Sequence, residues 1–161
     1  MSELAEALTH ESYAASPSHI LEGLTEDLVH RTTLNATHTI YQELWHLSFW
    51  QQITLDWIAE IETPYPENPS APFTPTTPEP WDHLRRRFLQ GAEKAASAAR
   101  DSFHLDQSIR CPSRPGHPVR IMTIRDQLIS LASHNAYHFG RVVLLRQLNQ
   151  AWPPPSGGFT W

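Results

Sequence analysis

The sequence has little of what several classes of protein need. It contains one cysteine, Cys111, so no disulfide can form within the chain and the fold does not depend on an oxidising compartment. No apolar run approaches the roughly 18 residues of a membrane-spanning helix. Basic side chains are scarce too, with 12 lysines and arginines against 17 acidic residues and a formal charge of -5. This balance disfavours binding to nucleic acid or to an anionic membrane surface.

Length and the first residues bound the organisation of the chain. With 161 residues and 18.4 kDa, it has the size of one ordinary domain, and we expect a single domain over 1–161. Residues 1–6 are acidic where a secretory signal is basic, so we expect a cytoplasmic protein.

Proline is plentiful instead, and its distribution divides the sequence. Seven of the 14 prolines fall between Pro64 and Pro80, while the blocks 18–63, 81–111 and 119–152 contain none. Because proline breaks a helix interior, those blocks are where long helices can form. None of them shows sustained alternation of β-branched residues, so we expect little strand.

Local capping signals predict where the helices begin. The steps Ser16-Pro17 and Thr77-Pro78 each place a capping side chain before a first-turn proline. Thr39 forms a capping box with Gln42, and Thr123 opens the last helix. The expected helices cover 3–14 and 17–29, kinked or broken at the proline, and then about 39–61, 78–100 and 124–148.

These helices predict an all-α fold, a four-helix bundle. Residues 62–80 form a proline-rich link after the second main helix, and 103–121 form the other long connection. An antiparallel neighbour needs only a short loop, whereas about 18 residues are enough to cross the bundle. We therefore expect a crossover connection rather than a simple up-down arrangement.

Three of the ten histidines are placed to meet. His134 and His138 are four residues apart, so they share one face of the last helix and can reach one ion. His46 shares a face of the second main helix with aromatic and apolar residues, so it also points inward. Three imidazoles from two helices can hold a divalent ion and leave positions open for water or substrate. The alternative is a set of core histidines with hydrogen-bond partners of their own.

Two other metal chemistries fit the sequence less well. The zinc-protease helix needs a glutamate directly after its first histidine, where this chain has Asn135. Glu43 and His46 match half of a carboxylate-bridged di-iron site, but Leu131 and Asn135 stand where the matching glutamates belong. We therefore interpret Glu43 as a carboxylate that orients a ligand imidazole or a bound water.

Three separated segments carry a family resemblance. They are Tyr41–Trp50 (YQELWHLSFW), His134–Arg146 (HNAYHFGRVVLLR) and the tail Ala151–Trp161 (AWPPPSGGFTW). Together they resemble the DinB-like (DinB/YfiT) superfamily. The resemblance implies an up-down-down-up four-helix bundle, often a homodimer, in which His46, His134 and His138 bind one metal ion.

The same resemblance implies thiol chemistry, since relatives include mycothiol-dependent maleylpyruvate isomerase and bacillithiol transferases. The favoured interpretation is a thiol S-transferase in which one divalent ion activates a low-molecular-weight thiol for attack on a small electrophile. Zinc or nickel is expected first, then iron or manganese. Glu43 is expected to orient a ligand or accept a proton. Arg141 is a candidate to anchor a substrate carboxylate, and the alternative, which the residues favour slightly, is an arginine that forms a salt bridge near the end of the bundle. A metal-dependent hydrolase and a non-catalytic, metal-binding dimeric bundle stay open as alternatives.

Aromatic side chains give two further expectations. For Phe49, Trp50 and Trp57 ordinary core packing is the favoured interpretation, with the walls of a cavity as the alternative, and His38 is a candidate for the mouth of a cavity. The tail over 149–161 is too apolar to remain free, so we expect it to pack on the end of the bundle or on a partner subunit.

Overall fold

The computed structural model describes residues 2–9, 15–68, 71–75 and 77–157. The expected helical residues 10–14 lie outside this part of the chain. In chain order the elements are α1 (Glu3–Thr9), α2 (Pro17–Ile20), α3 (Glu26–Val29), α4 (Ile40–Ile58), the 3-10 turn η1 (Ala71–Phe73), α5 (Trp81–Arg100), β1 (Ser108–Cys111), β2 (Arg120–Thr123) and α6 (Ile124–Leu148).

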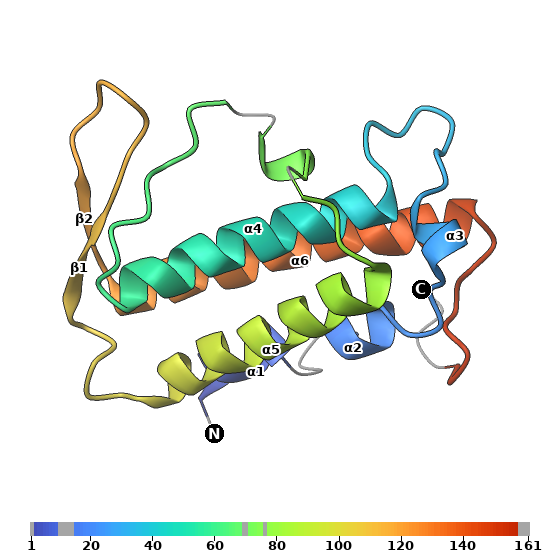
Figure 1. Cartoon of the computed structure of the whole chain (residues 1–161). Helices are drawn as coiled ribbons and strands as arrows, with labels where there is room; N and C mark the ends of the chain where they lie inside the picture. The colour runs from blue at the N-terminus through green and yellow to red at the C-terminus, as the bar shows by residue number, and fades with distance from the viewer. Residues whose placement is uncertain (1, 10–14, 69–70, 76, 158–161) are drawn as a thin grey trace.

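The bundle of α1, α4, α5 and α6 has the predicted up-down-down-up order. In Figure 1, α4 and α5 run in one direction and α1 and α6 in the other. α4 packs against both α5 and α6, and α1 packs mainly against α5. The mostly helical architecture, with a crossover between the parallel α4 and α5, confirms the expected fold class. None of the described helices is long and apolar enough to cross a membrane.

Two apolar clusters fill the bundle. One gathers the starts of α4 and α5 with the end of α6, and it includes the fully buried Leu44, Phe88 and Val142. The other gathers the later parts of α4 and α5 with the start of α6 and the sheet. Where the two clusters meet, α4 and α6 bury a group of polar side chains: Glu43, His46, Gln51, Asn135 and His138.

The threonine caps of α4 and α6 are confirmed. Thr39 Oγ1 accepts from the N–H of Gln42, and the Gln42 side chain accepts from the N–H of Thr39. Thr123 and Asp126 make the same reciprocal pair before α6. α4 ends at Ile58, earlier than its expected end near residue 61.

The single helix expected over 17–29 is wrong. Ser16 does cap α2, but that helix ends at Ile20 and α3 forms separately. Gly23 between them has a φ of 69°, a left-handed conformation that ends a helix. A Cβ at Gly23 would also lie 2.6 Å from Pro155 of the tail, so the backbone approaches that residue closely.

The expected start of α5 at Thr77-Pro78 is also wrong, because the helix begins at Trp81. The N–H of Trp81 donates to Glu26 Oε2 at 2.8 Å, and the Tyr41 hydroxyl donates to the Glu79 carbonyl at 2.7 Å. The bond from Trp81 holds the pKa of Glu26 below its ordinary value. A carboxylate from α3 therefore caps α5, a long-range contact that a local sequence pattern does not contain.

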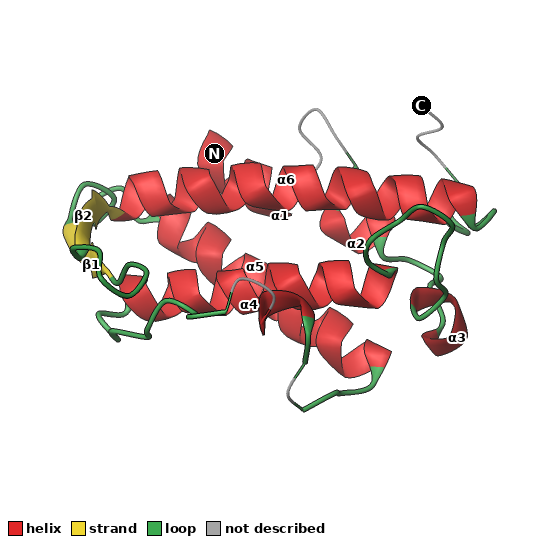
Figure 2. Ribbon diagram, turned by 90° about the horizontal axis from the view of Figure 1, so that it is seen from above, coloured by secondary structure: helices red, strands yellow, loops and turns green. Residues whose placement is uncertain are grey.

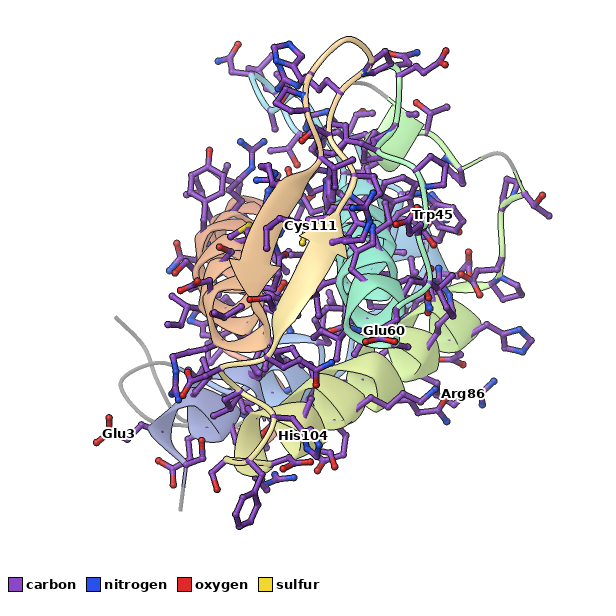
Figure 3. All side chains as sticks on the ribbon, turned by 90° about the vertical axis from the view of Figure 1, so that its left-hand side faces the viewer. Glu3, Trp45, Glu60, Arg86, His104 and Cys111 are labelled. Carbon is purple, nitrogen blue, oxygen red and sulfur yellow. The ribbon has the colours of Figure 1, made fainter. Side chains whose placement is uncertain are left out.

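The connection between α5 and α6 forms a hairpin that the sequence did not predict. β1 and β2 pair antiparallel, with Ile109 opposite Met122 and Cys111 opposite Arg120. The strands are four residues long, too short to show sustained alternation. Ile109 and Cys111 are buried against the bundle. The hairpin covers the end of the bundle where α4 and α5 end and α6 begins (Figures 2 and 3).

The tail packs on the opposite end of the bundle, as expected for its described part. Arg146 is 2% exposed, and its Nε donates to the Ala151 carbonyl at 2.9 Å, while its Nη1 donates to the Ile20 carbonyl. Its guanidinium also lies 5.4 Å from the centre of the Trp152 ring. Residues 158–161 lie outside the described residues.

Truncation after Asn149 should lower the melting temperature by about 5 °C or more, because the buried Arg146 loses the Ala151 carbonyl and the cover of Trp152. The measurement is thermal unfolding followed by circular dichroism. The full-length chain is the reference. An equal melting temperature for the truncated and the full-length protein would contradict the prediction.

Candidate metal centre

The packing of α4 against α6 brings the three predicted histidines together. His46, His134 and His138 each offer one nitrogen, and these three atoms lie within 4.8 Å of one another. The closest pair is Nε2 of His46 and Nε2 of His134, which are 3.0 Å apart. His46 and His138 are buried and His134 is partly exposed, so the cluster lies at the edge of the core.

The donor set fits one divalent ion. Imidazole nitrogens bind zinc and similar ions at about 2.0–2.1 Å, so two nitrogens that are 3.0 Å apart can reach the same ion. The third ligand has its other ring nitrogen engaged, because His138 Nδ1 lies 2.6 Å from Glu43 Oε2. This contact leaves Nε2 of His138 as the nitrogen that can bind a metal.

Glu43 is the buried anion of the site. Its side chain has no exposed surface, and besides His138 its Oε1 accepts from Arg141 Nε at 2.8 Å. His38 Nδ1 lies 3.6 Å from the same oxygen. A carboxylate that holds the second nitrogen of a ligand histidine fixes its ring orientation and raises its basicity. Glu43 makes such a contact with His138, and its role in orienting a metal ligand stays a prediction.

Burial sets the charge state of the cluster. Removal from water, reinforced by the neighbouring imidazoles, lowers the pKa of His46 to about 3 and that of His134 to about 4. Both rings are therefore neutral at neutral pH, the state in which imidazole binds metals. Burial alone would raise the pKa of Glu43, but the His138 hydrogen bond and the Arg141 charge together lower it below its ordinary value.

Arg141 hydrogen-bonds to Glu43 and is not among the residues that line the cavity beside the histidines. Its Nη2 donates to Thr37 Oγ1 at 3.2 Å, and its Nη1 donates to the Tyr137 hydroxyl at 3.5 Å. The hydrogen bonds to Tyr137 and Glu43 and the charge of Glu43 raise the pKa of Arg141, against the effect of burial. The guanidinium thus stabilises the buried carboxylate. The predicted contact with a substrate carboxylate stays a prediction.

A cavity of about 440 Å³ opens beside His46 and His134. Trp50 and Trp57 line it, and they also pack with the second apolar cluster, so both interpretations of these residues apply. Phe49 instead lines a separate groove of about 620 Å³ between α4 and the crossover. The remaining lining residues, which the sequence analysis did not single out, are Thr54, Tyr65, Arg120, Gln127, Ser130 and Leu131.

Phe73 covers the histidines from the crossover. Its ring stacks on His46 with 3.9 Å between centres and on His38 with 3.8 Å, so it lies between these two residues. His38 is about a quarter exposed and is not among the residues that line the cavity, so its predicted place at a cavity mouth stays a prediction. Phe73 was missed because nothing in the proline-rich segment indicates that η1 folds onto α4.

The comparison with known proteins agrees with this arrangement. A family model described as mycothiol S-transferase matches residues 4–151, which is most of the chain. The protein belongs to the mycothiol S-transferase family. This family lies within the DinB/YfiT-like superfamily, so the resemblance drawn from the sequence is confirmed. No curated protein matches the chain. All three histidines of this mycothiol S-transferase family protein, with Glu43 and Arg141, fall inside the matched range.

Glu43→Gln should weaken zinc binding by about 10- to 100-fold, because the amide orients His138 less well and adds no negative charge. The measurement is competition for zinc against a chromogenic chelator. Glu93→Gln makes the same chemical change on an exposed part of α5 and should bind zinc like the wild type. Equal affinities for the wild type and Glu43→Gln would contradict the role given to Glu43.

Proposed function

We propose that the protein is a thiol S-transferase that uses a divalent metal ion, held by His46, His134 and His138, to activate mycothiol or a similar small thiol. The observation that carries the proposal is that two histidines, both neutral at neutral pH, line one open cavity. His46 and His134 face each other across 3.0 Å and both line the 440 Å³ space. The choice of mycothiol as the thiol in this proposal is based on membership in the mycothiol S-transferase family.

A divalent ion bound by three neutral imidazoles keeps its full charge, and that charge lowers the pKa of a thiol placed beside it. Zinc and nickel suit three imidazoles best, and iron or manganese is also compatible with the set. The new bond joins the thiol sulfur to the electrophilic carbon, while the thiol proton and the leaving group are released.

The residues around the histidines orient His138 and line the cavity. Glu43 holds His138 in one orientation through the 2.6 Å contact, and Arg141 holds Glu43. Both are positioning residues in this proposal. Trp50 and Trp57 line the cavity with apolar surface, which excludes water from a reactive sulfur. The cavity also offers polar side chains to the hydroxyl and amide groups of a thiol: Thr54, Gln127 and Ser130.

Hydrolysis remains the competing chemistry, since the same ion can activate water. It differs in one measurable way, because hydrolysis needs no thiol and transfer fails without one. The third interpretation, a metal-binding bundle without catalysis, predicts a site with no adjoining cavity, and the space beside His46 and His134 argues against it. A homodimer and a cytoplasmic location remain expectations from the sequence.

Protein purified without a tag or a nickel column should contain about one equivalent of a transition metal, and His46→Ala should lose it because a three-ligand site loses one ligand. Elemental analysis measures the metal. His83→Ala is the control, since His83 is exposed on α5 and outside the cluster. The same metal content in His46→Ala and wild type would rule out this site.

The metal-loaded wild type should join mycothiol to a bimane or dinitrophenyl electrophile, with the product measured by chromatography. His46→Ala should lose this activity and His83→Ala should keep it. Consumption of an ester at the same rate with and without thiol would instead identify a hydrolase.

A further inference from the structure

The end of the cavity away from the histidines is positively charged, although the protein as a whole is acidic. The chain is acidic overall, with a formal charge of -5. Yet neither the cavity beside His46 nor the adjoining hollow of about 470 Å³ has an acidic residue among its lining side chains. The two spaces share Tyr65 and Arg120, and the second adds Arg114 and His117. The described surface here is cationic.

The hairpin register directs Arg120 to this place. Arg120 pairs with Cys111 across the two strands, and residues directly opposite each other project from the same face of a sheet. Cys111 is fully buried against the bundle, so Arg120 belongs to the face that meets α4 and α6, and its exposed side chain, at the start of β2, lies at the rim of the cavity. Its neighbours in sequence and register project the other way: Ile121 is 61% exposed and pairs with Arg110.

Arg120 and Arg114 also lack the partners that nearby arginines have. Arg110 pairs with Glu62, and Arg125 pairs with Asp106 at 2.9 Å. Within the described residues, neither Arg120 nor Arg114 makes an ion pair with a carboxylate. The recorded contact of Arg114 is with the Tyr65 ring, whose centre lies 6.0 Å from its guanidinium. Two guanidinium groups at the open side of the cavity are thus available to bind an anion.

We propose that the electrophile taken by this site is an organic acid, and that Arg120 binds its carboxylate. This inference rests on the proposed thiol transfer and names the class of the second substrate. A guanidinium presents paired N–H donors that match a carboxylate. With the acid held at the hairpin end, the rest of the molecule extends along the rings of Trp50 and Tyr65, which pack against each other with centres 5.1 Å apart, toward His46 and His134.

Arg120 suits this task better than Arg141, the arginine that the sequence suggested. Arg141 already donates to Glu43 and is not part of the cavity lining. Arg114 stands in the adjoining hollow, where its charge attracts the same anion without touching the histidine end. Arg120 is therefore the specificity-determining residue, and Arg114 contributes at longer range.

The test compares cinnamate with cinnamamide, two planar electrophiles of nearly equal shape that differ in charge. Binding to the zinc-incubated full chain is followed by quenching of tryptophan fluorescence, since Trp50 and Trp57 line the cavity. The wild type should bind cinnamate about tenfold more tightly than cinnamamide, the size expected for a hydrogen-bonded charge. Arg120→Gln should abolish this preference by weakening cinnamate alone, and Arg120→Lys should keep part of it.

Arg110→Gln is the matched control. It removes the same charge from the same hairpin, but on the other face and from an arginine paired with Glu62. It should keep the wild-type preference. A preference that survives in Arg120→Gln would overturn the proposal and show that the metal ion or another group binds the carboxylate. Equal binding of the two probes to the wild type, or no binding of cinnamate, would overturn it as well.

This experiment needs neither a thiol nor turnover, so its result is separate from that of the thiol-transfer assay. Equal binding of cinnamate and cinnamamide by the wild type, together with intact transfer to a neutral electrophile, would refute the role of Arg120 alone. A normal preference with no thiol transfer would refute the proposed function and leave the anion site standing.

Discussion

The buried carboxylate of Glu43 is the constraint on which the rest of the site depends. A charge without exposed surface needs compensation, and removing one partner of such a group costs several kcal/mol. Here His138 and Arg141, both from α6, provide the compensation. Because they lie on one face of that helix, these contacts fix the register of α4 against α6. The same register places His46 opposite His134.

The apolar clusters on either side of this polar group make the arrangement rigid. Leu44 and Leu47 on α4 belong to one cluster and Ile53 belongs to the other, so the polar group is packed from both directions along the helix. Interiors packed at this density leave side chains little freedom to change rotamer. Three histidines held in this way are preorganised for an ion, so their side chains would lose little further conformational entropy when one binds.

The sequence predicted the parts of the site that depend on helical spacing. His134 and His138 share a face because they are four residues apart, and Thr39 and Thr123 cap their helices through neighbours three residues away. Features that depend on distant contacts were missed. The cap of α5 comes from Glu26, which is 55 residues away from Trp81. The hairpin was not predicted because strands of four residues are too short to show a clear alternation of apolar and polar residues. The position of Arg120 in the cavity wall was therefore not predicted either.

The predicted metal ligands lie on the helices of the fold, and several of the missed residues lie on the connections between them. The histidines and Glu43 come from α4 and α6, whereas Tyr65, Phe73 and Arg120 come from the crossover and the hairpin. The helices therefore supply the residues that could hold an ion, and the connections shape the space beside them. Loops tolerate substitution and insertion far better than packed helices do. A family built on this bundle can keep one metal site and change its second substrate by altering two connections, and in this chain those connections place an arginine where an anion would enter.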